Sequence, residues 1–176
     1  MIKRLAVLGV LLLSSACATT QGPPPPAVAR ATPPTAEFRP SDFAWSTVAG
    51  GGRIQGQLSY RPGGKRYSCA DSGVLLTPET PWTRRRMEIL YTSAEHAALP
   101  AGEVRGRTPP GRSGDYSAFV KRATCDSTGR FSFEGLADGA WFVITVAKPA
   151  TSGAGPDMAI MRRVVVRGGR AVAVSL

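Results

Sequence analysis

Hydrophobic and polar residues alternate along several short segments of this chain. In residues 52–60, Ile54, Leu58 and Tyr60 fall on one face, and glutamine and serine side chains fall on the other. Residues 130–134 alternate in the same way. A period of two is typical of a β-strand with one buried face, so each segment is predicted to form a strand.

Continuous apolar runs predict further strands. Residues 73–77 form a short apolar run that ends at Pro78, and residues 118–123, which follow a loop and include Lys121 and Arg122, are also predicted as a strand. β-Branched and aromatic side chains fill most of residues 141–147. Residues 141–147 are therefore expected at the centre of a sheet, where both faces of the strand are buried.

The C-terminal segment predicts a β-hairpin. Residues 158–166 and 171–176 are apolar strands that flank a turn containing Gly168 and Gly169. Two glycines supply the positive φ angles of a type I′ turn, which joins neighbouring antiparallel strands. Because the last strand is apolar to its end, we expect it to be paired within a sheet.

One helix interrupts the strands. Thr80 and Pro81 are typical of a helix N-cap and of the first helical position, and the helix can continue through residues 82–91. Residues 98–115 are rich in Gly, Pro and Arg and are expected to form a long exposed loop. Seven strands without βαβ alternation predict an all-β protein, an antiparallel sandwich with one short helix in an inserted loop. The helical side chains expected to face the core are Met87, Leu90 and Tyr91.

The first sixteen residues have the three parts of a secretory signal. Lys3 and Arg4 give a positive start, residues 5–13 form an apolar core, and residues 14–16 are small. The apolar run is too short to cross a hydrocarbon core of ~30 Å as a helix. The segment is therefore predicted to be removed and not retained as a membrane span.

Cys17 follows this signal. The sequence Ser14-Ser15-Ala16-Cys17 resembles the lipobox of bacterial lipoproteins, with Ser14 where leucine is usual. The resemblance implies cleavage after Ala16 and a diacylglycerol thioether on Cys17, with an amide-linked acyl chain such as palmitate. Because Ala18 and not aspartate follows, it also implies sorting to the outer membrane. Several acyl chains anchor firmly, since each buried CH₂ contributes about 0.8 kcal/mol. The alternative is ordinary secretion, with cleavage near this position and no lipid attached to Cys17.

Residues 19–40 are predicted to be an extended spacer. Seven prolines and few large apolar side chains disfavour a packed core and favour polyproline II. At about 3.1 Å per residue, the segment reaches on the order of 60 Å. A proline-rich recognition peptide is the alternative. The predicted organisation is a signal peptide (1–16), a lipidated cysteine with its linker (17–40) and a sandwich domain (41–176).

Composition and charge refine this picture. The 176 residues are 43% hydrophobic and 19% charged, with 20 Gly and 15 Pro, which fits one globular domain with many turns. The formal net charge is +10, and +8 once Lys3 and Arg4 leave with the signal. A basic excess favours anionic partners. However, the only arginine run, residues 84–86, has no interleaved aromatic residues, so no nucleic-acid partner is predicted.

Residues 126–141 resemble a known family signature. The segment DSTGRFSFEGLADGAW fits the pattern D-x-x-G-x-F-x-F-x-x-L-x-x-G-x-[WY] of carboxypeptidase regulatory-like domains. The resemblance covers residues 52–148 and implies a prealbumin-like (transthyretin-like, Ig-like) sandwich that acts as a non-catalytic accessory module. It also implies a tight turn at residues 126–129. The family joins its second and third core strands briefly, whereas residues 79–116 form a long insertion here.

Two cysteines remain after Cys17. Cys69 precedes the second predicted strand and Cys125 precedes the fourth. A pair of cysteines in an exported protein suggests a disulfide. In the chain-entropy model such a bond stabilises the fold by about 4 kcal/mol. Two buried thiols or a metal-binding pair are the alternatives.

The sequence offers no constellation typical of catalysis, a metal or a cofactor. His96 is the only histidine, so it predicts neither a catalytic triad nor a zinc site, and it is expected in a solvated loop. Asp126 and Thr128 lack the repeated acidic positions of a calcium loop and are interpreted as a turn. We therefore predict that the protein is not an enzyme and has no catalytic or metal-binding residues and no cofactor. A hidden carboxylate pair is the enzymatic alternative.

Together these features predict a bacterial envelope lipoprotein. Its lipid anchor is expected to hold it at the outer membrane, facing the periplasm or the exterior. Its sandwich is expected to be a structural or interaction module with an envelope protein or a glycan as partner. The alternative is a binder of anionic polysaccharide or lipopolysaccharide that uses the arginines of the insertion. These arginines are Arg84, Arg85, Arg86, Arg105, Arg107 and Arg112.

Overall fold

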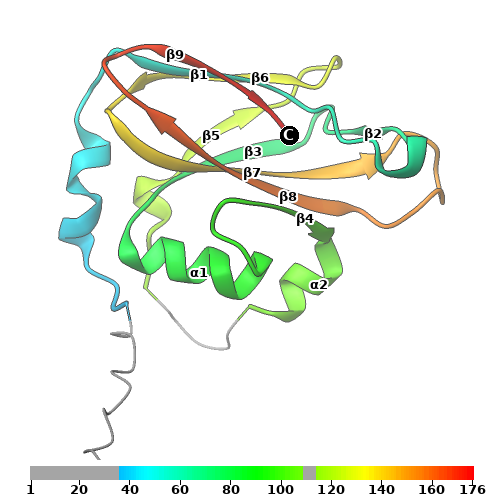
Figure 1. Cartoon of the computed structure of the whole chain (residues 1–176), viewed down its shortest axis with the longest axis horizontal. Coiled ribbons are helices and arrows are strands. Elements are labelled where there is room, and N and C mark those ends of the chain that lie inside the picture. The colour runs from blue at the N-terminus through cyan, green and yellow to red at the C-terminus, as the bar shows by residue number, and fades with distance from the viewer. Residues whose placement is uncertain (1–35, 109–113) are drawn as a thin grey trace, which may run out of the picture. The chain divides into compact units, whose positions relative to one another are not determined.

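The computed structural model describes residues 36–108 and 114–176 (Figure 1). Cys17, the signal segment and most of the predicted spacer lie outside the described residues, as does Arg112. The lipidation site and one candidate arginine therefore stay predictions from sequence.

β-Strands dominate the described residues. In chain order they are β1 (Gly52–Gln57), β2 (Tyr67–Ser68), β3 (Gly73–Pro78), β4 (His96–Pro100), β5 (Lys121–Thr124), β6 (Arg130–Leu136), β7 (Gly139–Pro149), β8 (Met158–Val166) and β9 (Ala171–Ser175). The α-helices are α1 (Pro81–Tyr91) and α2 (Ala101–Gly106). Short 3₁₀ helices are η1 (Pro40–Thr47), η2 (Pro62–Gly64) and η3 (Ser117–Phe119).

These strands form two sheets that pack as a β-sandwich, which confirms the predicted fold class. The three-stranded sheet has the order β6-β1-β9, and the large sheet has the order β4-β8-β7-β3-β5, with β2 paired to β7. Neighbours are antiparallel except β1 and β9, which run parallel. The short strands β2 and β4 are additional to the seven predicted. Residues 118–120, predicted as strand, are mostly the 3₁₀ helix η3, and pairing begins at Lys121.

The apolar run of β7 is central, as predicted, because both of its faces are covered. Trp141 and Val143 pack in the core between the two sheets. Phe142 and Ile144 point the other way and belong to a second apolar cluster, beneath the helices. Both faces exclude water, so the strand tolerates no polar alternation. The buried Thr145 hydroxyl is satisfied by the carbonyl of Gly73, at 3.0 Å.

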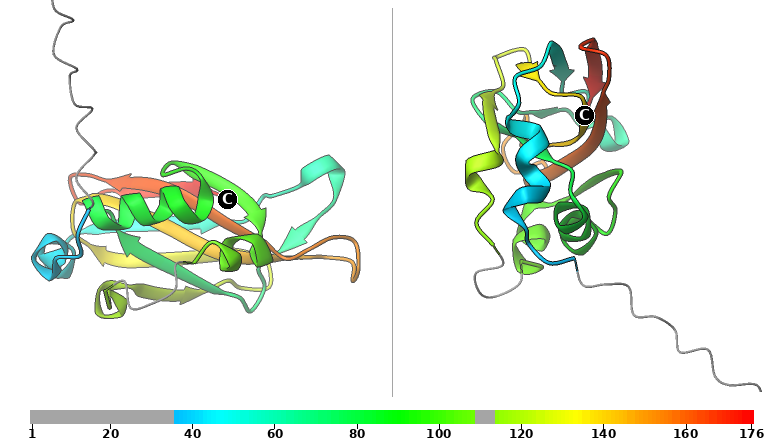
Figure 2. Two further views of the ribbon diagram at one scale, coloured as in Figure 1. Left: turned by 90° about the horizontal axis from the view of Figure 1, so that it is seen from below. Right: turned by 90° about the vertical axis from the view of Figure 1, so that its left-hand side faces the viewer.

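The insertion between β3 and β5 folds into a third layer. Both helices lie against the outer face of the large sheet, and β4 adds an edge strand beside β8 (Figures 1 and 2). The expectation of an exposed loop over residues 98–115 is therefore wrong for residues 98–106. Ala101 and Val104 bury their side chains in the second cluster, and that burial favours folding over exposure. His96, expected in a loop, begins strand β4 and is solvent-exposed.

Helix α1 begins where the sequence predicts. The Thr80 hydroxyl accepts a hydrogen bond from the backbone N–H of Thr83, and the Thr83 hydroxyl accepts one from the backbone N–H of Thr80. This reciprocal pair satisfies donors that a helix start leaves open. The expected core residues are buried, but in the second cluster and not between the sheets. They are Met87, Leu90 and Tyr91.

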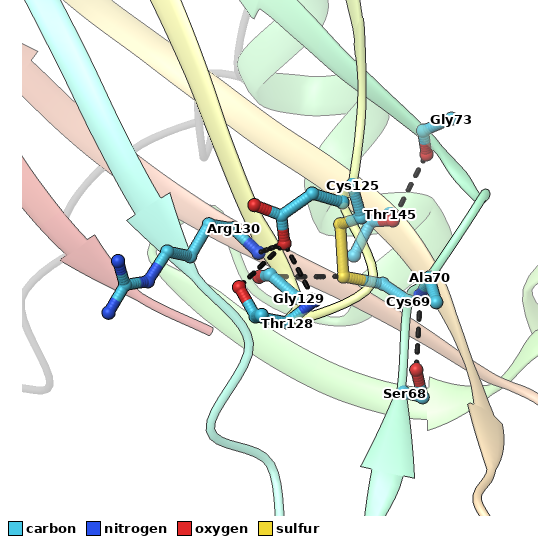
Figure 3. Close-up of a disulfide and its surroundings, with 10 residues drawn as sticks. Ser68, Cys69, Ala70, Gly73, Cys125, Thr128, Gly129, Arg130 and Thr145 are labelled. Atoms are coloured by element: carbon cyan, nitrogen blue, oxygen red, sulfur yellow. Dashed lines mark hydrogen bonds between the residues drawn. A yellow bond between two sulfur atoms is a disulfide. The ribbon is translucent and has the colours of Figure 1, made fainter.

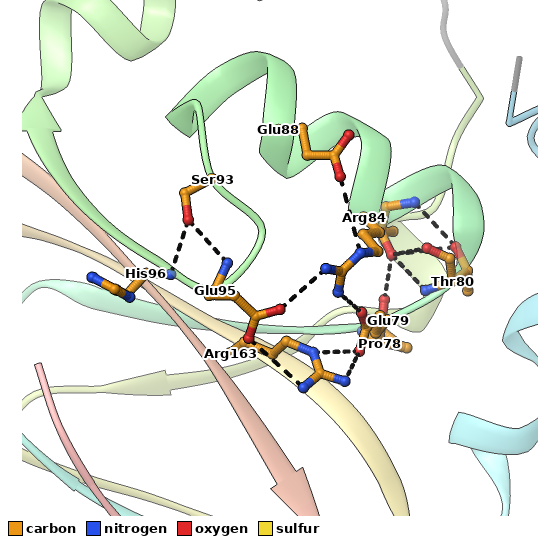
Figure 4. A network of polar contacts seen from close by, with 10 residues as sticks. Pro78, Glu79, Thr80, Arg84, Glu88, Ser93, Glu95, His96 and Arg163 are labelled. Carbon is orange, nitrogen blue, oxygen red and sulfur yellow. Dashed lines mark hydrogen bonds and ion pairs between the residues drawn. The ribbon is translucent and has the colours of Figure 1, made fainter. Parts of the chain in front are cut away.

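A network of ion pairs fastens α1 to strand β8 (Figure 4). Glu79, with 13% of its side chain exposed, accepts from Arg84 at 2.6 Å and from Arg163 at 2.7 Å. Arg84 also reaches Glu95 at 3.1 Å. Burial alone would raise the pKa of Glu79, but the hydrogen bonds from Arg163 and Arg84 outweigh it and hold the pKa below its ordinary value. The carboxylate therefore stays charged at neutral pH.

The C-terminal strands do not form the predicted hairpin. The turn itself is present, with φ of +61° at Gly168 and +64° at Gly169, and the Asp138 carboxylate accepts hydrogen bonds from both backbone N–H groups. Strand β8, however, pairs with β7 along residues 158–166 and with β4 along residues 158–162, and it does not pair with β9. Strand β9 crosses to the other sheet and pairs with β1, so the expectation that the last strand is paired is confirmed.

Aromatic contacts join the start of the described chain to the insertion. Phe38, within the segment predicted as spacer, lies 5.5 Å from Phe43 and 5.3 Å from Trp82, between ring centroids. The guanidinium of Arg86 lies over the rings of Trp82 and Tyr116. The residues that precede β1 are thus packed against α1.

Candidate binding face

One sheet face remains uncovered within residues 36–108 and 114–176. Helices cover the outer face of the large sheet, whereas none lies over the outer face of β6-β1-β9 (Figure 1). Alternation in β1 buries Ile54 and Gly56 and directs Gln55 and Gln57 outward. We name this surface the open face.

The strand register sets the outward side chains of the open face in two rows. These rows are Ser132–Gln55–Ala173 and Arg130–Gln57–Ser175. Neither glutamine side chain has a hydrogen-bond partner among the described residues. At one end an ion pair between Arg53 and Glu134, at 3.2 Å, closes the face. The Ser175 hydroxyl is hydrogen-bonded to Ser59, so the two glutamine amides and the Ser132 hydroxyl are the groups that remain available to a ligand.

A groove of about 820 Å³ follows the open face. Its volume falls within the range of small-molecule sites, about 300–1,000 Å³. Polar and apolar surface line it in about equal parts. The lining residues are Gln55, Gly56, Gln57, Ser59, Ala123, Thr124, Asp126, Arg130, Phe131, Ser132, Ala173, Val174 and Ser175.

Gly56 allows the sheet to close beneath the groove. A Cβ atom at this position would lie 1.9 Å from Cζ of Phe131. The Phe131 ring therefore takes the space of the missing side chain and fills the core under β1. A larger residue at position 56 would displace this ring and the strand that supports Gln55 and Gln57.

Charges of both signs stand at the β6 side of the groove. The Arg130 side chain has no hydrogen bond or ion pair among the described residues and extends away from its turn (Figure 3). The pKa of Asp126 is lowered by hydrogen bonds from the backbone N–H of Arg130 and from Thr128. Asp126 is thus an ionised acceptor that is already engaged by its own turn, while Arg130 is a free donor.

A disulfide lies beneath this turn (Figure 3). Cys69 is bonded to Cys125, as predicted, and both residues are buried. Cys125 exchanges backbone hydrogen bonds with Asp71 and Ser72, which ties β5 to the start of β3. Gly129, at φ +79°, completes the turn, and its carbonyl accepts from the backbone N–H of Leu58 at 2.9 Å. The cross-link therefore supports the segment that carries Asp126 and Arg130.

The arginines proposed from sequence are not gathered into one free patch. Arg84 is paired with Glu79 and Glu95, and Arg85 is paired with Glu88 at 3.2 Å. Arg86 lies against aromatic rings, Arg107 is paired with Glu103 in α2, and Arg105 is exposed. Arg112 and Cys17 lie outside the described residues. Ion pairs with glutamates within the chain thus neutralise several of the arginines that the sequence suggested for binding an anionic ligand.

Sequence reasoning missed the open face. Its glutamines and serines carried a clear signal, because they are the polar half of the alternation in β1 and β6. That half is usually just the solvated side of a strand. Only the three-dimensional layers distinguish a sheet face that stays open from one that helices cover.

Comparisons with known proteins extend the fold assignment. No protein-family model and no curated protein matches the chain. A crystal structure from Pseudomonas aeruginosa, provisionally described as a carbohydrate binding protein, aligns with 79% of this chain and 97% of that chain. Its TM-score is 0.51 and its sequence identity is 18%. The minor pilin of Streptococcus agalactiae aligns with 75% of this chain and 44% of that chain, with a TM-score of 0.36 and 16% identity. The first likeness shows a shared β-sandwich fold.

Two further features are absent from the described part of the chain. None of its helices combines the length and apolar character needed to cross a membrane. Within the same residues, no group of three or more His, Cys, Asp or Glu side chains is placed to hold a metal ion.

Proposed function

We propose that this protein is a lipid-anchored binding module of the bacterial envelope whose open face binds a glycan. The observation that carries this proposal is an uncovered sheet face on which the unpaired amides of Gln55 and Gln57 and the Ser132 hydroxyl lie in register. Cross-strand rows of Gln, Ser and Arg side chains present both donors and acceptors at fixed spacing. A ligand rich in hydroxyl groups matches such a surface, because each hydroxyl both donates and accepts.

The composition of the open face favours a glycan over a protein partner. Stable protein interfaces contain an apolar or aromatic core, with most of the binding energy in Trp, Tyr and Arg. Here the middle of the groove holds Gln55, Gln57, Ser132 and Ala173. The provisional description of the Pseudomonas structure names the same class of ligand for that protein. An envelope protein as partner remains an outcome of the test.

Steric blocking of the groove tests this function. In the variant Ala173→Trp, an indole fills the middle of the open face, whereas Ala44→Trp places the same side chain on the exposed surface of η1. On a glycan array, the first variant should lose at least ten-fold in affinity for any retained glycan, and the second should bind like the parent. Retention of an envelope protein but of no glycan would contradict the proposed ligand. Equal binding by both variants would remove the open face as the site.

The anchor requires a separate test. The proposal places acyl chains on Cys17, ahead of a proline-rich spacer that holds the sandwich away from the membrane. Cys17→Ala should move the protein from the membrane fraction to the soluble fraction. Unchanged fractionation would refute lipidation and leave the binding face untouched.

A further inference from the structure

The groove of the open face borders a second cavity of about 310 Å³. Gln57 and Ser59 line both spaces, and the turn after Cys125 contributes Asp126 to the first and Thr128 to the second. The two spaces therefore adjoin at the end of β1, and a chain-like ligand that follows the open face lies next to the second cavity.

Two unpaired cations converge on this second cavity. The chain reverses at η2, where Gly63 and Gly64 have φ of +56° and +79°, so that Arg61 and Arg66 both line the cavity. Neither arginine side chain has a hydrogen bond or an ion pair among the described residues, and no acidic residue lines the cavity. Asp126, in the adjoining groove, is the nearest acid of the shared turn, and its own turn engages it.

Two tyrosines also line this cavity, and their segment is held in place by backbone pairing and a hydrogen bond. The rings of Tyr60 and Tyr67 meet edge to face, with centroids 5.3 Å apart. Pairing of β2 with β7 and a hydrogen bond from Lys65 to the carbonyl of Ala154, at 3.2 Å, hold the η2 segment in place. Tyrosine combines an apolar ring, which packs on the C–H face of a sugar, with a hydroxyl that hydrogen bonds. Serine and threonine hydroxyls complete the lining.

We infer that this cavity is an acidic-sugar subsite, in which Arg61 and Arg66 bind the carboxylate or phosphate of a glycan that lies along the open face. The inference rests on the proposed function and specifies its ligand class. Guanidinium groups bind both anions through paired N–H donors. The subsite also supplies a location for anionic-polymer binding that is outside the arginine-rich insertion.

The test uses the full chain on an array of neutral, uronate-bearing and phosphate-bearing oligosaccharides. Arg61→Gln/Arg66→Gln should weaken binding to acidic members by about ten-fold and leave neutral members unchanged. The matched control Arg85→Gln/Arg105→Gln removes the same charge from the insertion and should change neither. The two acidic sets distinguish a carboxylate from a phosphate as the preferred anion. Added salt should weaken the acidic members more, because it screens the exposed arginines.

Other outcomes overturn the inference in distinguishable ways. If glycans bind but the Arg61/Arg66 variant keeps its preference for acidic members, the inference of an acidic-sugar subsite is wrong, while the proposal that the open face binds a glycan is unaffected. Loss of that preference in the Arg85/Arg105 variant would move the anion site to the insertion. If polyglutamate competes as well as an acidic glycan of equal charge, the site recognises charge and not sugar. Retention of no glycan at all would remove the proposed function together with the subsite.

Discussion

Removing the disulfide should lower the stability of the sandwich by several kcal/mol. The bond joins Cys69 to Cys125 across 56 residues, and the closed loop contains all of the insertion. In the unfolded chain this cross-link removes about 14 cal/mol/K of loop-closure entropy, which is about 4 kcal/mol at 25 °C. That is a large share of the 5–15 kcal/mol by which a typical domain is stable.

The assay is urea unfolding of the oxidised parent and of the parent that was reduced in denaturant and refolded with a thiol present. With a urea m-value of about 2 kcal/mol/M, the midpoint should fall by about 2 M. Cys69→Ala/Cys125→Ala also loses buried sulfur, so it should be slightly less stable than the reduced parent and should not respond to the thiol. A difference below about 1 kcal/mol between oxidised and reduced parent would refute the entropic reasoning.

Three other changes probe separate parts of the structure. Glu79→Gln should lower the free energy of unfolding by about 1–3 kcal/mol at pH 7, because it weakens the charged hydrogen bonds from Arg163 and Arg84. Since the pKa of Glu79 is lowered in the folded state, that stabilisation is present above the ordinary carboxyl pKa and is lost as the pH falls through the lower folded value. In urea unfolding, the difference in unfolding free energy between the parent and Glu79→Gln should be smaller at pH 3 than at pH 7. An equal difference at both pH values would contradict the lowered pKa of Glu79. Gly56→Val should cost about 1–3 kcal/mol by overpacking against Phe131, and an unchanged urea midpoint would show that the ring yields freely. Asp138→Ala should speed amide exchange at the glycines of the β8–β9 turn, and unchanged protection there would show that the carboxylate does not hold the turn.

The strands were predictable where local pattern and burial agree. Alternation located β1 and β6, because each buries one face against the core. The unbroken apolar run of β7 indicated a strand covered on both sides, although the sequence did not show that helices form one cover. The disulfide was predictable from the number of cysteines together with the predicted export signal. It needed no knowledge of geometry.

The pairing of β9 and the folding of residues 96–106 depended on contacts between segments that are distant in the sequence. Gly168 and Gly169 form the turn that the sequence predicted, yet β9 crosses to the other sheet and pairs with β1, while β4 pairs with residues 158–162 of β8. Residues 96–106 contain Gly and Pro, which favour loops, but a few apolar side chains gain burial on the large sheet and order the segment. The polar half of the alternation in β1 and β6 was visible in the sequence, but it did not show that no helix covers this face.

Amide hydrogen exchange across the chain, with and without the glycan that the array retains, tests the central claim most directly. The account predicts slower exchange along β1, β6 and β9 and, for an acidic glycan, in the η2 segment with Arg61 and Arg66. Protection confined to α1 and α2, with no change on the three-stranded sheet, would contradict it.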